Sequence, residues 1–450
     1  MAPRFGTDGI RGVAGTEITP RLARCLGAAA VEALGTDAPF LIARDTRESG
    51  PMLEAALVAG IAGAGGRVQL LGVLPTPGLA SRCADSDAPG VMISASHNPF
   101  SDNGLKLFER GGRKLRDDTE AAVEAALDVL FAQPESPSGA IDAGRADAVV
   151  SMADAGNVYV AHLIGAAGGG KPFSGIRVVL DCAEGASAVV APAAFAALGA
   201  DVDVIHANPD GVNINAGCGS TYPEVVAAVV VDRGADLGLA FDGDADRVLA
   251  VDATGAVVDG DHILAILALD LDARGRLRNR AIATTVMANL GLRRALEPHD
   301  ITVVTTPVGD RHVIAAMEEH DLVLGGEQSG HIIESEFAAT GDGPLTGILL
   351  LGAMTRVGSS LADLAAVVTK YPQVLRNVKV ADRVGLDAAT EFWAAVAQAE
   401  AELGSEGRVL VRPSGTEPVV RIMVEAAESA TADRITDALS AALITALGKG

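Results

Sequence analysis

A run of reactive side chains follows an apolar segment in VMISASHNPFSDNGLK, residues 91–106. If Ser96 carries a phosphoryl group, His97 and Lys106 are cations that neutralise the transferring group, and nearby amides can donate hydrogen bonds to it. These amides are Asn98 and Asn103. The residues alone do not choose between Ser94 and Ser96, and we expect the reacting hydroxyl to be exposed on a loop at a strand end. A simpler interpretation is that Ser-His-Asn-Pro only caps a helix.

Three aspartates stand at alternate positions in FDGDADR, residues 241–247, just beyond another apolar segment: Asp242, Asp244 and Asp246. Carboxylates at this spacing repel one another unless a cation joins them, and the sequence places no pair of cations beside them. Mg²⁺ takes oxygen ligands of this kind and keeps positions open for water or phosphate. We therefore predict a magnesium site in this loop.

Other interpretations of the aspartates stay open at this point. They could form a solvated acidic turn that pairs with Arg247, or Asp242 could be a phosphorylated nucleophile with Asp244 as the acid. The second alternative leaves the stretch 91–106 without a role. An EF-hand is excluded, because Arg247 fills the sixth loop position, where glycine is required, and Ala253 fills the twelfth, where glutamate belongs.

Two further polar loops suit a phosphorylated polyol. The segment VRPSGTEPVVR, residues 411–421, offers guanidinium groups, hydroxyls and backbone N–H groups that bind phosphate, from Arg412, Ser414, Gly415, Thr416 and Arg421. The segment LGGEQSGH, residues 324–331, offers groups that suit sugar hydroxyls, from Glu327, Gln328, Ser329 and His331. Either loop alone could be an ordinary turn. The glycine-rich GAAGGGKP, residues 165–172, is not a P-loop, because Pro172 replaces the metal-binding Ser/Thr and no strand clearly precedes it.

These loops follow apolar runs that alternate with helical segments, which indicates βαβ units with mostly parallel sheets and chemistry at the carboxyl ends of the strands. A segment rich in Pro, Ser and Gly, 132–148, is typical of a linker. We predict four domains: 1–150 with Ser96, 151–255 with the aspartates, 256–368 with the polyol loop and 369–450 with the phosphate loop. In the last domain, two alternating strands and an amphipathic helix indicate an antiparallel α+β arrangement.

Composition narrows the class of partner. The 450 residues include 35 basic and 58 acidic side chains, so the net charge is 35 − 58 = −23, which disfavours nucleic acid and anionic membrane surfaces. No apolar run approaches the roughly 18 residues needed to cross a bilayer. The four cysteines show no CxxC spacing, which favours reduced thiols. We expect a globular α/β enzyme of the cytoplasm that acts on a small molecule.

Five segments resemble the α-D-phosphohexomutase superfamily, in order along essentially the whole chain: FGTDGIRG (5–12), SASHNPFSDNGLK (94–106), FDGDADR (241–247), GGEQSGH (325–331) and RPSGTEP (412–418). The segments GEQSG, TPVGDRHV and YPQVLRNV are most similar to its bacterial phosphoglucosamine mutases. The resemblance implies an α/β fold with three topologically similar mixed-sheet α/β domains and a smaller C-terminal α+β domain around one cleft.

The resemblance also implies roles for individual residues. Ser96, the serine immediately before the histidine, would be the phosphoserine, and it would share Mg²⁺ with Asp242, Asp244 and Asp246. Sugar contacts would come from Glu327 and Ser329. The phosphate clamp would be Arg412, Ser414, Gly415, Thr416 and Arg421, and the groups around the transferring phosphate would be Arg11, His97, Lys106, Arg247 and His331.

The implied activity is the interconversion of glucosamine 6-phosphate and glucosamine 1-phosphate, which supplies UDP-N-acetylglucosamine for cell-wall synthesis. It would proceed through the phosphoserine and a hexosamine 1,6-bisphosphate that turns end for end, under a C-terminal domain that excludes water. The partner would be a sugar phosphate rather than nucleic acid or membrane, and a homodimer is compatible with the sequence. Two alternatives are a phosphomannomutase or phosphoglucomutase, and a non-catalytic regulator that binds sugar phosphates.

Overall fold

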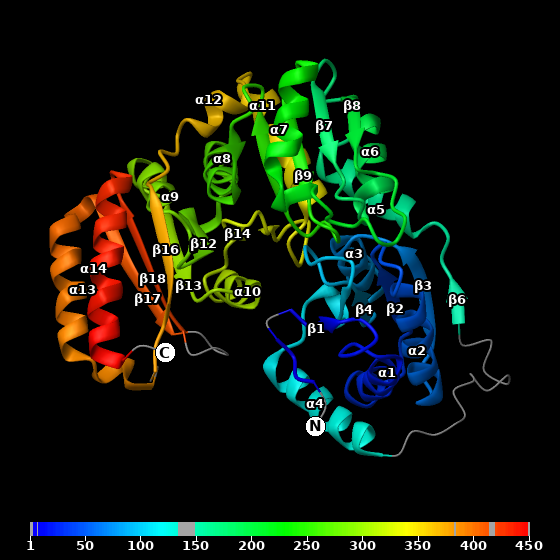
Figure 1. Cartoon of the computed structure of the whole chain (residues 1–450). Helices are drawn as coiled ribbons and strands as arrows, with labels where there is room; N and C mark the ends of the chain where they lie inside the picture. Colours follow the sequence, from blue (N-terminus) through cyan, green and yellow to red (C-terminus); the bar gives the residue numbers. More distant parts are fainter. Residues whose placement is uncertain (1–2, 7, 134–148, 382–383, 414–418, 449–450) are drawn as a thin grey trace. The chain divides into compact units, whose positions relative to one another are not determined.

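The computed structural model describes residues 3–6, 8–133, 149–381, 384–413 and 419–448 (Figure 1). The chain forms two compact units, the first from 1–287 and 301–367 and the second from 288–300 and 368–450. Three sheets belong to the first unit and one sheet to the second. In the described ranges, no helix combines the length and the apolar character that crossing a bilayer requires.

The first sheet has the strand order β1-β5-β4-β2-β3-β6 and is mixed, because β5 runs antiparallel to both of its neighbours. Both faces are buried: Phe40 and Ile42 of β2 pack into a core shared with α1, α2 and α4, whereas Leu41 and Ala43 are buried on the opposite side. Its elements are β1 (Ile10–Val13), α1 (Pro20–Leu34), β2 (Phe40–Arg44), α2 (Gly50–Gly63), β3 (Val68–Val73), α3 (Thr76–Ser86), β4 (Gly90–Ile93), β5 (Asp102–Phe108), α4 (Asp117–Ala132) and β6 (Val149–Ser151).

The second sheet has the order β11-β10-β9-β7-β8 and the third the order β13-β12-β14-β15. Elements of the second are α5 (Ala155–Ala166), β7 (Arg177–Asp181), α6 (Ser187–Ala197), β8 (Asp201–Ile205), α7 (Pro223–Arg233), β9 (Leu237–Phe241), β10 (Val248–Asp252) and β11 (Val257–Val258). Elements of the third are α8 (Gly260–Ala273), β12 (Ala281–Thr285), β13 (Thr302–Thr306), α10 (Asp310–Glu319), β14 (Leu324–Gly326), β15 (Ile332–Glu334), α11 (Gly343–Val357) and α12 (Leu361–Ala365). The glycine-rich segment 165–172 begins in the last two residues of helix α5, which confirms that no strand precedes it.

The three sheets share one topology. In each, two parallel strands lie beside a third parallel strand that is followed by an antiparallel neighbour: β3-β2-β4-β5, β8-β7-β9-β10 and β13-β12-β14-β15. The loop between the last two strands occupies the same position in each sheet. These equivalent loops are 94–101, 242–247 and 327–331, and they contain the predicted serine, the aspartates and the polyol-binding residues. The three predicted sites therefore occupy the same topological position.

The second unit is a three-stranded antiparallel sheet in the order β16-β18-β17, with the core built largely by α13 and α14. Its elements are α9 (Leu290–Leu296), β16 (Gln373–Lys379), α13 (Thr390–Leu403), β17 (Gly407–Pro413), β18 (Val419–Ala426) and α14 (Ser429–Leu447). Helix α9 joins this unit because Glu425, buried and paired with Arg408 at 2.7 Å, also accepts the Leu290 N–H at 3.0 Å. The antiparallel α+β prediction is confirmed.

A buried carboxyl group links the second and third sheets. Asp342 caps α11 by accepting the Leu345 N–H at 2.8 Å, and it also accepts the Tyr159 hydroxyl of α5 at 2.8 Å. Burial raises the pKa of Asp342 to about 7. The folded protein therefore keeps this proton at pH values where the unfolded chain, with an ordinary aspartate pKa near 4, has lost it.

This linkage predicts a pH dependence of stability. As pH rises from about 4 to about 7, the unfolded state ionises first, so Asp342 contributes less to stability at each step and the loss is complete above pH 7. Asp342→Asn keeps an acceptor oxygen but cannot ionise. We expect its melting temperature to match the wild type at about pH 4 and to exceed it by at least about 2 °C at pH 8. Thermal unfolding across this range, with the exposed Asp118→Asn as control, tests this, and parallel profiles for wild type and Asp342→Asn would contradict it.

Candidate active site

The loop between β4 and β5 distinguishes its two serines. No helix begins within 94–101, so the helix-cap interpretation is wrong. Ser94 Oγ points inward, donating to Asp45 Oδ2 at 2.7 Å and accepting the Ser96 N–H at 2.9 Å. Ser96 adopts a left-handed backbone (φ 53°), and its Oγ donates to Asp242 Oδ2 at 2.5 Å. Both hydroxyls are fully buried, so the expectation of an exposed serine is wrong, but only Ser96 faces the aspartates.

The aspartate loop follows β9 and fits a cation. Asp242, Asp244 and Asp246 are buried, and each offers a carboxylate oxygen within 4.8 Å of the other two. The Oδ1 atoms of Asp244 and Asp246 have no hydrogen-bond partner among the described residues. Burial, followed by the charges of Asp246 and Asp244, raises the pKa of Asp242 well above its usual value. Unpartnered buried oxygens and mutual repulsion are the features that a hard divalent ion relieves.

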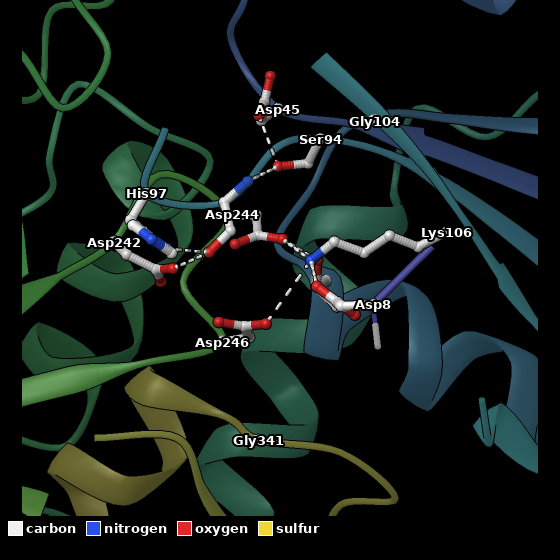
Figure 2. Close-up of polar contacts among 12 residues, drawn as sticks. Asp8, Asp45, Ser94, His97, Gly104, Lys106, Asp242, Asp244, Asp246 and Gly341 are labelled. Carbon is white, nitrogen blue, oxygen red and sulfur yellow. Dashed lines mark hydrogen bonds and ion pairs between the residues drawn. The ribbon is translucent and has the colours of Figure 1, made fainter. Parts of the chain in front are cut away.

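The aspartates also have cationic neighbours, so the expectation that they lack them is wrong (Figure 2). Lys106 Nζ lies 2.7 Å from Asp244 Oδ2, 2.8 Å from Asp8 Oδ2 and 3.7 Å from Asp246 Oδ2. Lys106 belongs to β5, whose pairing with β4 places it opposite Met92 and beside the second sheet's loop. Burial opposes its charge, but Asp244 and Asp8 outweigh burial and raise the pKa of Lys106. Lys106 therefore stays positive, as predicted.

His97 is neutral near pH 7 when Ser96 carries no phosphate. Burial, with the charges of Arg247 and Arg11, lowers the pKa of His97 to about 4. Arg247 Nη1 lies 3.1 Å from His97 Nδ1, and an arginine can only donate, so Nδ1 is the acceptor. The same Nδ1 lies 3.3 Å from Ser96 Oγ. With Ser96 unphosphorylated, burial and the neighbouring arginines therefore keep His97 neutral. Its positive charge beside a phosphorylated Ser96 stays a prediction.

The loop between β14 and β15 presents two of the predicted sugar contacts together. Ser329 Oγ donates to Glu327 Oε2 at 3.4 Å, and Glu327 Oε1 accepts the Gly309 N–H at 3.2 Å. Gln328 turns away and donates to Asp261 at 2.9 Å. The turn needs glycine at 330, where φ is +88° and a Cβ would lie 2.1 Å from a backbone oxygen.

His331 ends this turn and reaches the aspartates. It is buried, and its Nδ1 lies 3.6 Å from Asp246 Oδ2. Burial lowers the pKa of His331, but Asp246 outweighs burial and raises it. The backbone of Gly341, labelled in Figure 2, covers the ring so closely that a Cβ there would lie 2.5 Å from it.

A cavity of about 360 Å³ is lined by some of these groups. Its lining does not include Ser96, His97, Lys106, Asp242, Asp244 or Ser329. It has room for a sugar phosphate, and it is lined by charged residues of both signs that come from all three sheets. Those predicted from the sequence are Arg11, Asp246, Arg247, Glu327 and His331. Asp8 and Asp310 also line it, and Lys114 forms ion pairs with both. A site with cations and hydrogen-bond acceptors around a buried metal-binding loop can bind a phosphorylated polyol and transfer a phosphoryl group.

Several contributors were missed by sequence reasoning. Asp8 lies inside the segment FGTDGIRG, but its acidic side chain was not singled out. Thr76 donates to Asp244 Oδ2 at 2.6 Å from the first turn of α3, where the helix dipole favours negative charge. Asp45 and Arg47, just after β2, support residues 94–101, which we call the serine loop. Only Asp8 had a signal in the sequence, because the others depend on contacts across the fold.

The second unit places two predicted clamp residues opposite each other. Arg412 of β17 pairs in register with Arg421 of β18. No ion pair to either guanidinium is formed by the described part of the chain, and Arg421 Nε is buried without a partner there. Burial and the charge of Arg421 lower the pKa of Arg412. Like charges opposed across a sheet are unfavourable unless an anion joins them. The other predicted clamp residues, Ser414, Gly415 and Thr416, lie outside the described residues.

Four family models match almost the whole chain. They are described as phosphoglucomutase/phosphomannomutase alpha/beta/alpha domain I (residues 2–131), domain II (158–255), domain III (259–371) and the C-terminal domain (375–442). Among curated relatives, a phosphoglucosamine mutase of Clavibacter michiganensis subsp. michiganensis is 53% identical over 451 residues, covering 99% of each chain. One of Saccharopolyspora erythraea is 51% identical over 446 residues, covering 98% of each.

Solved structures agree in fold. A phosphoglucomutase/phosphomannomutase family protein from Burkholderia thailandensis matches with a TM-score of 0.80 and 25% identity, over 99% of this chain and 98% of that one. Aspergillus fumigatus N-acetylphosphoglucosamine mutase, solved with GlcNAc-6P and magnesium, matches with a TM-score of 0.69 and 19% identity, over 99% and 96% of the two chains. With full-length relatives at about 50% identity, this chain belongs to the phosphoglucomutase/phosphomannomutase family of phosphohexomutase enzymes.

Proposed function

We propose that this enzyme interconverts glucosamine 6-phosphate and glucosamine 1-phosphate through a phosphoserine at Ser96. The observation that carries the proposal is the position of the Ser96 hydroxyl, 2.5 Å from Asp242, while Ser94 donates to Asp45 instead. Asp242 also accepts the N–H of Arg247, a residue that lines the charged cavity. The names of relatives at about 50% identity over the whole chain support the choice of glucosamine phosphate. We assign the reaction to the cytoplasm, since the buried thiols of Cys83, Cys182 and Cys218 suit a reducing compartment.

The reaction consists of two phosphoryl transfers. In the first, the O–P bond to Ser96 breaks as a P–O bond forms to the free hydroxyl of the sugar phosphate. That hydroxyl loses its proton to a base in the site, and the departing oxygen of Ser96 takes up a proton to become a hydroxyl again. The resulting 1,6-bisphosphate turns end for end, and its other phosphoryl group returns to Ser96. Lys106, Arg11 and Arg247 are the cations beside Ser96 and the aspartates that can stabilise the charge of the transferring group.

The carboxylates of Asp242, Asp244 and Asp246, together with an oxygen on Ser96, would hold Mg²⁺. Once bound, the ion supplies positive charge to the oxygens of the transferring phosphoryl group. Two unpartnered buried carboxylate oxygens support this assignment. Ser96 Oγ already contacts Asp242, so a phosphate on this oxygen would extend from the side of the loop that carries the ligands.

The choice of sugar is tested by a substrate panel. Glucosamine 6-phosphate carries an ammonium at C2, and Glu327 is the carboxylate we assign to it, because the Gln328 amide is committed to Asp261. A charge-assisted hydrogen bond contributes roughly 1.5–3 kcal/mol, or about one to two decades in kcat/KM. We expect at least tenfold preference for glucosamine phosphate over glucose and mannose phosphates in one set of conditions. Equal or reversed values would assign the chain to phosphomannomutase or phosphoglucomutase activity, and turnover of none would favour a binding protein.

The arginine pair of the second unit gives a separate prediction. We assign Arg412 and Arg421 to the phosphate that is not reacting, since two opposed guanidiniums need an anion. Arg421→Ala is expected to lower kcat/KM by about 10- to 100-fold, because a charge-assisted contact that orients the sugar is lost. The control is Arg376→Ala on β16, where the guanidinium is already paired with Asp433 at 3.2 Å. An unchanged kcat/KM for Arg421→Ala would exclude this arginine from the clamp.

A further inference from the structure

Arg47 is a fully buried arginine just after the carboxyl end of β2. It does not line the charged cavity, and its hydrogen bonds do not go to the three aspartates of the metal loop. Its Nε donates to Asp45 Oδ2 at 2.9 Å, and its own backbone N–H donates to Asp45 Oδ1 at 3.0 Å. A buried guanidinium is costly unless its donors are satisfied. The burial of this charged side chain therefore needs a structural explanation.

The remaining donors of Arg47 all bind backbone carbonyls, three in the serine loop and one at the first residue of β5. Nη2 donates to two carbonyl oxygens, at 2.9 and 2.8 Å, and Nη1 donates to two more, one of them at 3.0 Å. In order, these carbonyls belong to Ser96, Asn98, Asp102 and Pro99. A guanidinium has five N–H donors, so all five are used and none remains for a phosphate. Arg47 binds the main chain of the loop whatever the side chain of Ser96 carries.

Asn215 holds the same loop from the second sheet. Its Nδ2 donates to the carbonyls of Ser96 at 2.9 Å and Asn98 at 3.0 Å, the two that Arg47 Nη2 also binds. Asn215 has a left-handed backbone (φ 58°), and its N–H donates to the Ala183 carbonyl at 2.9 Å. Gly243 leaves room for this contact, since a Cβ there would lie 2.7 Å from the Ser96 carbonyl oxygen.

We propose that Arg47 and Asn215 are positioning residues that hold Ser96 Oγ in its transfer geometry, an inference that rests on the phosphoryl transfer proposed above. Ser96 needs such a hold for two reasons. Its left-handed backbone is one that serine seldom adopts. A phosphoserine also carries about −1.5 to −2 charge beside three carboxylates, which repel it whenever Mg²⁺ is not bound. Hydrogen bonds to four backbone carbonyls hold the loop against both the strain at Ser96 and the repulsion of its phosphate. Neither Arg47 nor Asn215 has to contact the reacting atoms to do so.

The test is Arg47→Lys, which keeps the charge but has three donors instead of five. Because a displacement of about 1 Å can cost on the order of 100-fold in rate, we expect kcat to fall by about 10- to 100-fold. KM should stay within about threefold, since Arg47 does not line the cavity. Asn215→Ala should lower kcat by a smaller factor, again with little change in KM. In the double variant, the fold reduction in kcat should be smaller than the product of the two single reductions, because both residues bind the same carbonyls. Amide hydrogen exchange in 95–103 should rise in each variant.

The control is Arg356→Lys, which changes another arginine held by a carboxylate, with two 2.8 Å bonds to Asp270. Arg356 does not line the charged cavity. It should lower the melting temperature without changing kcat. The inference is overturned if Arg47→Lys and Asn215→Ala keep the kcat of the control, or if KM rises as much as kcat falls. If Arg47→Lys does not fold, Asn215→Ala decides by the same criteria. If the wild type converts no hexose phosphate, the proposed function is rejected instead. Amide hydrogen exchange of residues 95–103 in the variants then still tests whether Arg47 and Asn215 hold the loop in place.

Discussion

Ser96→Ala is expected to abolish turnover, with kcat reduced to the detection limit, because the proposed phosphoryl carrier is removed. The fold should survive, since the variant loses one hydroxyl bond to Asp242 and so costs about 1 kcal/mol. Circular dichroism and the melting temperature check the fold, and a coupled assay for sugar 1-phosphate checks turnover. Retention of more than a few per cent of wild-type kcat would refute the role of Ser96.

Ser94→Ala is the matched variant, because it removes a neighbouring buried hydroxyl that donates its hydrogen bond to Asp45 rather than to Asp242. It should keep measurable turnover, and phosphate should still appear on Ser96. Mass spectrometry of the active protein should find a hydroxylamine-stable phosphate within 91–106. A hydroxylamine-labile phosphate on Asp242 would instead support the aspartyl-phosphate alternative.

Removal of the metal should have the second large effect. Excess chelator is expected to lower activity by at least about 100-fold, and added Mg²⁺ to restore it, because three buried carboxylates then repel one another and the transferring phosphate loses its main counter-charge. Asp244→Asn should weaken Mg²⁺ binding by discarding one ligand charge. Its effect is also readable without turnover, as a smaller Mg²⁺-induced rise in melting temperature than in wild type.

The control for the metal is the exposed Asp118→Asn, which should keep both the activity and the Mg²⁺-induced stabilisation. Full activity in excess chelator would rule out the metal site. A Mg²⁺ response of Asp244→Asn equal to that of the wild type would show that Asp244 is not a ligand, even if the enzyme needs the ion.

The sequence by itself determined the chemistry available at each strand end. The aspartates form a cluster because they stand at alternate positions of one short loop, so their proximity is a local property of the chain. The apolar runs before the loops predicted strands correctly, since a strand buried on both faces needs a nearly continuous apolar sequence. The five segments that resemble phosphohexomutases fixed the family, which the full-length relatives confirm.

The tertiary structure alone decided how these groups act on one another. Ser96 meets Asp242, which is 146 residues away, and Lys106 meets Asp244, which is 138 residues away. Neither pairing follows from local spacing. The choice of Ser96 over Ser94 depends on a backbone angle and on Asp45, and the neutral state of His97 depends on burial and on Arg247. Burial and charge at a site are sums over every neighbour in space, so they are set only when three sheets of one topology bring their equivalent loops together.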